Sequence, residues 1–450
     1  MNPAAHSRKT GCLWLLLTAL AISPFARAAT WQEQVLYSFQ GGSDGAVPAG
    51  GVVFDRSGNL YGATTDGNQY GELGVVYELS PPAKKGDPWT ESLIYQFLGK
   101  KDYNDGMNPV GGLVIDGAGN LYGTTAYGGS GGCILLGVLY GCGTVYELSP
   151  PRQKGGQWTE AILYSFQGDK DGYFPWGTLT FDAKGNLYGA TQFGGGKGNT
   201  CNEFYGGNCG TVFEMSPPKQ QGGHWTERVL HSFAGGADGA NPNGGPVLDT
   251  KGAIYGTTFS GGNQGCKTSY SLGCGAVFKL GPTTTRGSKW TEKLLHTFTG
   301  NSDGAAPDGN LIFDGSGGLY GCAGGGGGHS RGVVFHLVAH RDTWSISILY
   351  DFLGNRYGQD PTSGLLRDAN GNLYGESGGG VGGLVYRLKR SNGRWSFAAL
   401  YDFGGNGDGD SPAGGLERDS SGDLFGTTLY GGTGQNCGTG GCGTAFQVSP

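Results

Sequence analysis

The stretch FDRSGNLYGATT covers residues 54–65, and nearly the same phrase occurs seven times in the 450 residues of the chain. Each copy has an Asp, a Gly three residues later, and then Leu or Ile, an aromatic residue and another Gly; the later copies begin at Ile115, Phe181, Leu248, Phe313, Arg367 and Arg418. Self-similarity at about 50 to 70 residues, with four strand-like runs per unit, predicts a radial array of small sheets. We therefore expect an all-β fold, a seven-bladed β-propeller of four-stranded antiparallel blades.

The second unit shows what one blade contains. Its strand-like runs cover residues 111–116, 120–125, 143–149 and 158–166. Each run is rich in β-branched and aromatic residues and is bounded by Gly, Pro or Asn. No amphipathic helical pattern occurs after the first 30 residues.

The two ends of the chain carry complementary parts of a blade. WQEQVLYSF at residues 31–39 resembles the fourth-strand run WTEAILYSF at residues 158–166, and the chain stops on a third-strand run at residues 442–450. We expect the N-terminal strand to pair into the last blade, because this closes the ring and leaves no open sheet edge. Residues 29–450 are accordingly predicted to form one domain.

Composition excludes several other classes. Gly supplies 95 residues, but no Gly-X-Y period exists, so the glycines belong to turns rather than to collagen or to disorder. The net charge is −6 with all 30 basic and 36 acidic residues counted, and the first 28 residues hold three of the basic ones. This acidic balance predicts no nucleic-acid partner and no anionic membrane surface.

The first 28 residues have the pattern of a signal peptide. Arg8 and Lys9 precede an apolar run at residues 13–22, and Ala26 and Ala28 are the small residues that a signal peptidase requires. The apolar run is too short for a stable membrane span, and no anchor pattern follows at the carboxyl end. We expect a monomeric mature protein that is secreted, whether extracellular, periplasmic or associated with the cell surface.

Eight cysteines fall into four close pairs at the same place in their repeats. A short loop between neighbouring strands favours a disulfide in each pair, in agreement with an exported protein. Zinc is not expected at these cysteines, because no CxxC or HxxxH spacing is present, and no other metal or cofactor is predicted. Cys12 lies in the leader, and Cys322 is expected to be a buried, unpaired residue. The pairs are Cys133 with Cys142, Cys201 with Cys209, Cys266 with Cys274, and Cys437 with Cys442.

The phrases GNLYGTT, GTVYELSPP and LYSFxGxxDGxxPxGGL resemble the tandem repeat of the GloVer proteins, which are secreted bacterial proteins that often carry a surface anchor. The resemblance covers residues 31–450 and implies a repeat fold, but no activity and no catalytic residues. A looser similarity exists to propellers of the streptogramin-lyase and NHL type, whose blades also use Asp-x-x-Gly-Asn-Leu-aromatic.

The long Gly-rich and Cys-rich loops between second and third strands should emerge on one face, together with the Asp-Gly-x-x-Pro turns that enter each blade. Long loops on a rigid scaffold are where binding groups concentrate, so this is the candidate functional face. The repeated turn acids, such as Asp44 and Asp105, are interpreted as turn-forming residues rather than calcium ligands. Candidate binding residues on this face are Trp176, Tyr205, Tyr270, Arg331, Tyr357 and Tyr430.

Catalytic candidates are sought where the repeats differ. Glu376 replaces a Thr of the repeated phrase, His329 lies in the poly-Gly loop of the fifth repeat, and Arg356 replaces part of the turn that enters the sixth. An acid, a base and a cation at the mouth of the channel would suit a polysaccharide lyase or hydrolase. Drift at surface positions explains the same three residues, and no Ser-His-Asp order, phosphate loop or dinucleotide fingerprint is present.

The sequence thus indicates an extracellular recognition module for a polysaccharide or a protein, with no catalytic motif. The first alternative is an enzyme that uses Glu376, His329 and Arg356. The second is a structural protein of a surface or matrix. An open aromatic rim would favour binding, whereas convergence of the three candidate side chains on one cavity would favour the enzyme.

Overall fold

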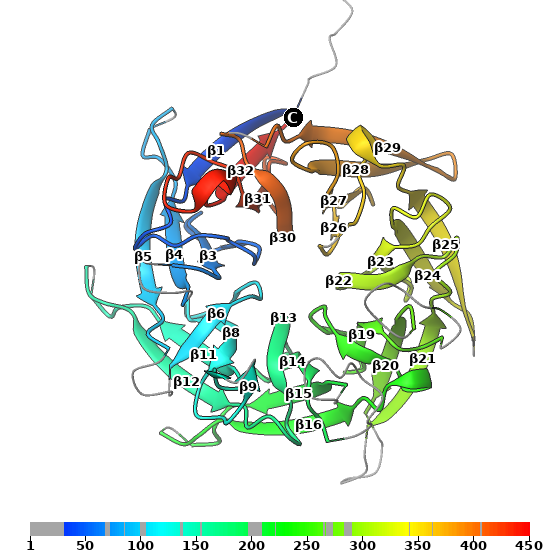
Figure 1. Ribbon diagram of the computed structural model, residues 1–450, viewed down its shortest axis with the longest axis horizontal. Coiled ribbons are helices and arrows are strands. Elements are labelled where there is room, and N and C mark those ends of the chain that lie inside the picture. Colours follow the sequence, from blue (N-terminus) through cyan, green and yellow to red (C-terminus); the bar gives the residue numbers. More distant parts are fainter. Residues whose placement is uncertain are drawn as a thin grey trace, which may run out of the picture. The chain divides into compact units, whose positions relative to one another are not determined.

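In the computed structural model, residues 31–450 form one compact unit with seven blades arranged in a ring around a central axis (Figure 1). The predicted seven-bladed β-propeller is confirmed. The structure describes residues 31–67, 73–84, 86–99, 105–135, 138–153, 155–196, 209–220, 222–263, 266, 273–282, 290–341, 343–361, 363–405 and 407–450. The proposed signal peptide lies outside these residues.

Each blade is an antiparallel sheet whose first strand lies innermost and whose fourth strand lies on the outer wall (Figure 1). Blade 1 contains β2 (Val53–Phe54), β3 (Leu60–Thr64), β4 (Val75–Ser80) and β5 (Thr90–Gln96). Blade 2 contains β6 (Gly106–Pro109), β7 (Val114–Ile115), β8 (Leu121–Gly128), β11 (Thr144–Ser149) and β12 (Thr159–Ser165). Blade 3 contains β13 (Tyr173–Phe181), β14 (Leu187–Phe193), β15 (Thr211–Ser216) and β16 (Thr226–Ser232).

The remaining blades follow the same plan. Blade 4 contains β17 (Ala240–Pro242), β18 (Val247–Leu248), β19 (Ile254–Ser260), β20 (Ala276–Gly281) and β21 (Thr291–Thr297). Blade 5 contains β22 (Ala305–Phe313), β23 (Leu319–Gly325), β24 (Val333–Ala339) and β25 (Trp344–Asp351). Blade 6 contains β26 (Leu366–Arg367), β27 (Leu373–Ser377), β28 (Leu384–Ser391) and β29 (Arg394–Asp402). Blade 7 contains β30 (Asp410–Arg418), β31 (Leu424–Tyr430), β32 (Thr444–Ser449) and β1 (Gln32–Ser38).

Short strands and 3-10 turns lie in the loops that connect the strands of the blades. The strands β9 (Ile134–Leu135) and β10 (Val138–Leu139) pair with each other in a loop of blade 2. The 3-10 turns are η2 (Gly236–Asp238), η3 (Asn355–Tyr357) and η4 (Gly438–Gly440). The sequence predicted a continuous first strand at residues 111–116, but in blade 2 the inner strand is divided into β6 and β7. The interruption contains Gly111, which packs against the backbone of Gly177 in the next blade. A Cβ at Gly111 would clash with the Gly177 carbonyl oxygen.

The recurring Asp-x-x-Gly-Asn-Leu-Tyr phrase forms the turn between first and second strands. In blade 2 the carboxylate of Asp116 accepts hydrogen bonds from the backbone N–H of Ala118 and Asn120, at 2.8 and 2.9 Å. Its second oxygen accepts from the Asn120 side chain and from the Tyr122 hydroxyl. Gly119 takes a φ of 89°, which L side chains rarely adopt. The Asp is therefore a turn-forming residue.

Aromatic contacts join every blade to the next. The Phe that follows each outer strand is buried and touches an aromatic residue on the third strand of the next blade, with ring centroids 4.9–5.4 Å apart. In each blade that aromatic ring lies over the Gly of the Leu-Tyr-Gly phrase, where a Cβ would lie within 3.0 Å of the ring or its hydroxyl. The phrase thus requires Gly because the inter-blade aromatic residue occupies the space of a side chain. The pairs are Phe39–Tyr77, Phe97–Tyr146, Phe166–Phe213, Phe233–Phe278, Phe298–Phe335, Phe352–Tyr386 and Phe403–Phe446.

Three of the four predicted disulfides are formed between described residues. They are Cys133–Cys142, Cys266–Cys274 and Cys437–Cys442, with Cα atoms 5.0, 5.6 and 5.3 Å apart. Cys209 is also disulfide-bonded, while Cys201 lies outside the described residues. Cys322 is buried and unpaired, as predicted, and burial raises the pKa of its thiol to about 12. Among the described residues no helix is long and apolar enough to cross a membrane.

Candidate binding face

A ring of strained residues surrounds the central axis on the face that carries the long loops. In all seven blades the residue before the Pro of the DGxxPxG phrase, or of its variant in blade 6, has a positive φ of 48–61° without being Gly. Each donates its backbone N–H to a carbonyl oxygen of the preceding blade at 2.8–3.1 Å. A non-Gly residue in this conformation costs on the order of 1 kcal/mol, so the inter-blade hydrogen bond holds it in place. The ring consists of Val47, Asn108, Phe174, Asn241, Ala306, Asp360 and Ser411.

The backbone of this ring is constant, whereas its side chains differ from blade to blade. We call these seven residues the variable ring. All are at least partly exposed, and they range from apolar to carboxylate. A fixed backbone that presents varied side chains at one face is the arrangement expected of a recognition surface.

An aromatic cluster on blades 2 and 3 surrounds Phe174 of the variable ring. Phe174 stacks on Trp176 with ring centroids 5.4 Å apart and planes 9° from parallel. The Phe174 ring also contacts Tyr127 at 5.0 Å and Phe193 at 5.8 Å. Tyr173 and Tyr140 extend the cluster through Phe193 and Tyr127 respectively. All six rings are only partly buried, so an apolar, aromatic surface remains accessible on this face.

A chain of polar side chains adjoins the aromatic cluster and runs from blade 3 through blade 4 to blade 5. The side chain of Asn243 donates to an Asp308 carboxylate oxygen at 2.7 Å and accepts from the side chain of Gln192. Gly177, directly after Trp176, packs against the backbone of Asn243, so this polar chain begins beside the aromatic cluster. Asp308 is partly buried, and burial raises its pKa to about 6 despite hydrogen bonds from Gly309 and Asn243. The cluster and the chain together place stacking and hydrogen-bonding groups side by side.

A charged sector occupies the loops of blades 5 and 6. His329 is exposed, and its Nδ1 lies 3.0 Å from an Asp351 carboxylate oxygen. Arg331 donates to the side chain of Gln359 at 3.2 Å. The Arg356 guanidinium lies over the Tyr357 ring, 5.0 Å from its centroid, and donates to the Tyr357 hydroxyl.

Glu376, the third catalytic candidate, has a different environment. It lies on β27, is fully buried, and accepts a hydrogen bond from the backbone N–H of Gly415 in blade 7 at 2.9 Å. Burial raises its pKa to about 7. No hydrogen bond or ion pair between described residues joins Glu376, His329 and Arg356 to one another. Their joint catalytic role stays a prediction.

The predicted binding residues are dispersed over the loop face. Trp176 belongs to the aromatic cluster, while Arg331 and Tyr357 belong to the charged sector. Tyr430 lies at the end of β31 and is 43% exposed. Tyr205 and Tyr270 lie outside the described residues. Sequence reasoning missed Phe174 as a site residue; its signal was an aromatic residue before Pro where the other repeats have small or polar residues or Val.

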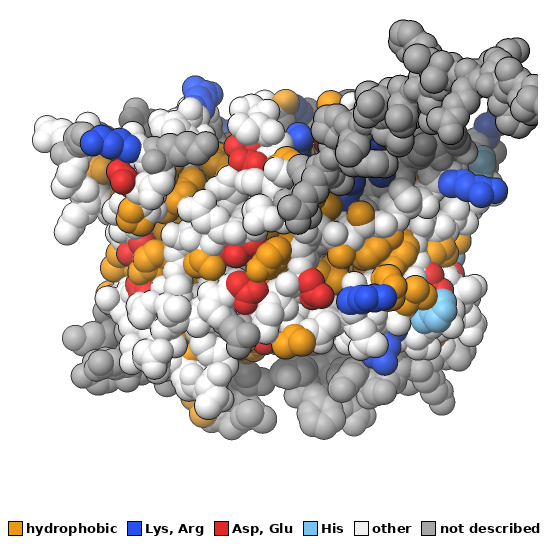
Figure 2. All heavy atoms as spheres, turned by 90° about the horizontal axis from the view of Figure 1, so that it is seen from above, with side chains coloured by type: hydrophobic (Ala, Val, Ile, Leu, Met, Phe, Trp, Pro, Cys, Tyr) orange, Lys and Arg blue, Asp and Glu red, His pale blue; other side chains and the backbone are white. Residues whose placement is uncertain are grey.

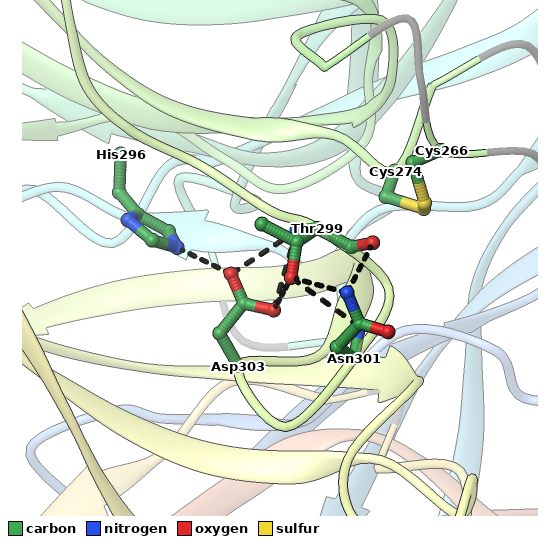
Figure 3. A network of polar contacts seen from close by, with 6 residues as sticks. All are labelled: Cys266, Cys274, His296, Thr299, Asn301 and Asp303. Atoms are coloured by element: carbon green, nitrogen blue, oxygen red, sulfur yellow. Dashed lines mark hydrogen bonds and ion pairs between the residues drawn. A yellow bond between two sulfur atoms is a disulfide. The ribbon is translucent and has the colours of Figure 1, made fainter.

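The turns that enter the blades are held by their repeated Asp. Figure 3 shows the turn of blade 5, beside the Cys266–Cys274 disulfide, where Asp303 accepts hydrogen bonds from the Thr299 backbone N–H and from the Thr299 hydroxyl. His296 on β21 lies 3.1 Å from the same carboxylate. These contacts within one turn explain the Asp without a calcium ion.

The chain belongs to the Gloeobacter/Verrucomicrobia repeat family, whose model matches residues 25–270, 197–380 and 266–450 in overlapping tandem. This confirms the resemblance that the repeated phrases indicated. No curated protein sequence matches the chain.

Several solved structures have a similar fold at low identity. A putative 6-phosphogluconolactonase from Bacteroides uniformis is 13% identical, with 77% of this chain and 83% of that one covered and a TM-score of 0.46. A protein from Lactobacillus plantarum is 13% identical, with coverage of 84% and 87% and a TM-score of 0.48. PorZ, a surface component of the type-IX secretion system of Porphyromonas gingivalis, is 13% identical, with coverage of 88% and 46% and a TM-score of 0.46.

Proposed function

We propose that this protein is a secreted recognition module whose loop face binds an extracellular carbohydrate or protein. The observation that carries the proposal is the partly exposed stack of Phe174 on Trp176, held on the strained variable ring next to the polar chain of Asn243 and Asp308. Disulfides between described residues support a location outside the cytoplasm.

The chemistry of this surface favours carbohydrate as the ligand. A sugar ring has an apolar face, which stacks on aromatic side chains, and a rim of hydroxyls, which needs donors and acceptors nearby. The aromatic cluster provides the stacking surface. Amides lie nearby, that of Gln192 in blade 3 and those of Asn241 and Asn243 in blade 4. Pre-organised groups on a rigid ring also reduce the entropy lost on binding.

The test measures retention of the oxidised, purified protein on a panel of immobilised polysaccharides and peptidoglycan, together with any products released into solution. Phe174→Asn and Trp176→Ala each introduce a residue that other blades carry at the same position. Asn108 and Asn241 are equivalent to Phe174, and Ala49 and Ala413 are equivalent to Trp176. We expect both variants to weaken retention at least tenfold. Val47→Asn introduces the same residue at the equivalent position of blade 1, which lies outside the aromatic cluster of blades 2 and 3. This variant is the control and should bind as the wild type does.

Retention that Phe174→Asn and Trp176→Ala leave unchanged would refute this assignment of the surface. Release of products that Glu376→Gln abolishes would replace the recognition module with the enzyme. Failure to retain any polysaccharide, combined with capture of extracellular proteins that depends on Trp176, would identify a protein ligand instead.

A further inference from the structure

Three potential metal ligands from two neighbouring blades meet where the outer strand of blade 3 leads into blade 4. His231 lies on β16 of blade 3, Asp238 ends the 3-10 turn η2 that enters blade 4, and Glu292 lies on β21 of blade 4. Each side chain offers one ligand atom, and these atoms all lie within 4.8 Å of one another. All three residues are partly buried, so the cluster is enclosed but reachable from solvent.

The hydrogen bonds of this cluster are incomplete. His231 Nε2 lies 3.5 Å from Asp238 Oδ2, which is longer than an ordinary N–H···O hydrogen bond. His231 Nε2 is a buried atom without a hydrogen-bond partner, and among the described residues it is the one histidine nitrogen of this kind. Glu292 Oε1 is unpartnered too, as is the equivalent atom of four other outer-strand glutamates. Unpartnered buried polar atoms are rare in native proteins, and a bound ion is one of their ordinary explanations.

At the equivalent positions of other blades the turn Asp has a different partner. In four of them a Tyr hydroxyl donates to the turn Asp at 2.9–3.2 Å: Tyr37–Asp44, Tyr95–Asp105, Tyr164–Asp171 and Tyr401–Asp408. At the entry to blade 5, His296 reaches Asp303 at 3.1 Å, but Ile346 occupies the position of the Glu. The residues at the His and Glu positions are described for all seven blade entries, and His and Glu coincide at one of them. There the His–Asp distance is 3.5 Å, compared with 3.1 Å for His296 and Asp303.

We propose that His231, Asp238 and Glu292 bind a divalent transition-metal ion, with zinc preferred. A tetrahedral zinc with bonds of about 2.0–2.1 Å places its ligand atoms about 3.4 Å apart, which agrees with the 3.5 Å between His231 Nε2 and Asp238 Oδ2. One imidazole and two carboxylates suit zinc, whereas calcium prefers a shell of oxygen atoms. Three protein ligands leave a fourth position for water or for a group of a partner.

Such an ion would join the outer strand of blade 3 to that of blade 4. None of the three residues belongs to the aromatic cluster or to the variable ring, so zinc binding can be tested separately from ligand recognition at the aromatic cluster. Glu292 is far from His231 and Asp238 in the sequence, so the spacing of the three residues matches no short metal-binding motif.

The test is calorimetric titration of zinc chloride into the wild-type protein, purified without a histidine tag and freed of metal with EDTA, at pH 8. We expect one zinc ion per chain. His231→Tyr introduces the residue that five other blades carry at this position, and Glu292→Gln keeps the shape of the side chain. Changing even an outer partner of a metal ligand costs 10–100-fold in affinity, so either variant should weaken zinc binding at least about 100-fold. Thermal unfolding should show the same pattern, with a zinc-dependent rise of the midpoint in the wild type alone.

His296→Tyr is the control, because it makes the same exchange at a blade entry that lacks the Glu. Zinc binding that His296→Tyr reduces as much as His231→Tyr would overturn the proposal, as would binding that His231→Tyr and Glu292→Gln leave unchanged. A wild-type protein that binds no zinc would overturn it equally. Circular dichroism checks that His231→Tyr is folded, and Glu292→Gln decides the matter if that variant is not.

Discussion

Gln32 lies opposite Ser449 in the antiparallel ladder between β1 and β32, so the first described strand of the chain completes its last blade. The ladder runs on to Ser38 opposite Thr444, with a bulge between Val35 and Tyr37. This confirms the predicted closure. At this point the ring is closed by the backbone hydrogen bonds between β1 and β32 and by the packing of the side chain that follows β1.

That side chain belongs to Phe39, which is fully buried and contacts Tyr77 of blade 1 with ring centroids 4.9 Å apart. Phe39→Ala should lower the free energy of unfolding by about 3–5 kcal/mol, because it removes a large buried ring and leaves a cavity at the closure. Urea unfolding followed by fluorescence measures the loss. Leu98→Ala is the control; Leu98 is 62% exposed, and its removal should change stability by less than about 0.5 kcal/mol. Equal effects of the two changes would refute this account of the closure.

The Gly of the Leu-Tyr-Gly phrase is predicted to be irreplaceable for a steric reason. A Cβ at Gly189 would lie within 3.0 Å of the Phe213 ring and of Leu179, both fully enclosed. Gly189→Ala should therefore destabilise the protein by about 1–3 kcal/mol through overpacking. Gly132, in a loop of blade 2, would have no atom within 4 Å of an added Cβ, so Gly132→Ala should stay within about 1 kcal/mol of the wild type. A Gly189→Ala variant as stable as Gly132→Ala would show that the inter-blade rings shift easily.

The fold was predictable because its characteristic phrase occurs seven times in the sequence. A single Asp-x-x-Gly-Asn-Leu-Tyr phrase is only a turn between two strands, but its spacing and the order of the surrounding runs define a blade and a ring. The closure was predictable for a similar reason, since residues 31–39 copy a phrase whose place in the blade was already known. The contacts that hold Asp116 and Asp303 are local, and local turns can be read from sequence.

The candidate sites were less predictable, because they depend on which way side chains point and on residues distant in the chain. The replacement of Thr by Glu376 was visible, but its burial and its hydrogen bond to Gly415 of the next blade were not. Phe174 and Trp176 form a stacked pair at a point where Phe174 adopts a positive φ, and neither feature is visible in the sequence. The approach of Glu292 to His231 likewise follows from the packing of one blade on another.

The outer wall should make stability depend on pH in an unusual direction. Figure 2 shows acidic side chains among hydrophobic ones along this wall. Five outer-strand glutamates lie near the Asp of a blade-entry turn, and in each the Oε1 atom is buried without a hydrogen-bond partner. Burial, and then the charge of that Asp, raises the pKa to about 7 in four of them and to about 8 in the fifth, Glu292. The pairs are Glu33–Asp408, Glu91–Asp44, Glu160–Asp105, Glu227–Asp171 and Glu292–Asp238.

Because these carboxyls have a pKa near 4.5 in the unfolded chain, the folded protein binds more protons than the unfolded one between that value and about 7. Their contribution to stability is complete below about pH 4.5 and is lost as the pH rises through 7. The urea midpoint should thus be lower at pH 8 than at pH 5.5. Burial lowers the pKa of His296, so this residue favours the folded protein more as the pH rises toward 6.5. Its effect on stability opposes that of the glutamates, but it is a single group and the glutamates are five. Carboxyls whose pKa is lowered, such as Asp182 and Asp368, act below about pH 4, outside this interval.

Replacing Glu91, Glu160 and Glu227 together with Gln should reduce the difference in midpoint between pH 5.5 and pH 8, because Gln keeps the shape of the side chain and does not titrate. Glu147→Gln is the control; Glu147 accepts a hydrogen bond from Ser149 and belongs to none of the five pairs, so the difference should persist. A wild-type midpoint that is constant or rises from pH 5.5 to pH 8 would mean that the five glutamates are ionised in the folded ring. Because burial disfavours the charged form of each carboxyl, we expect the midpoint to fall instead.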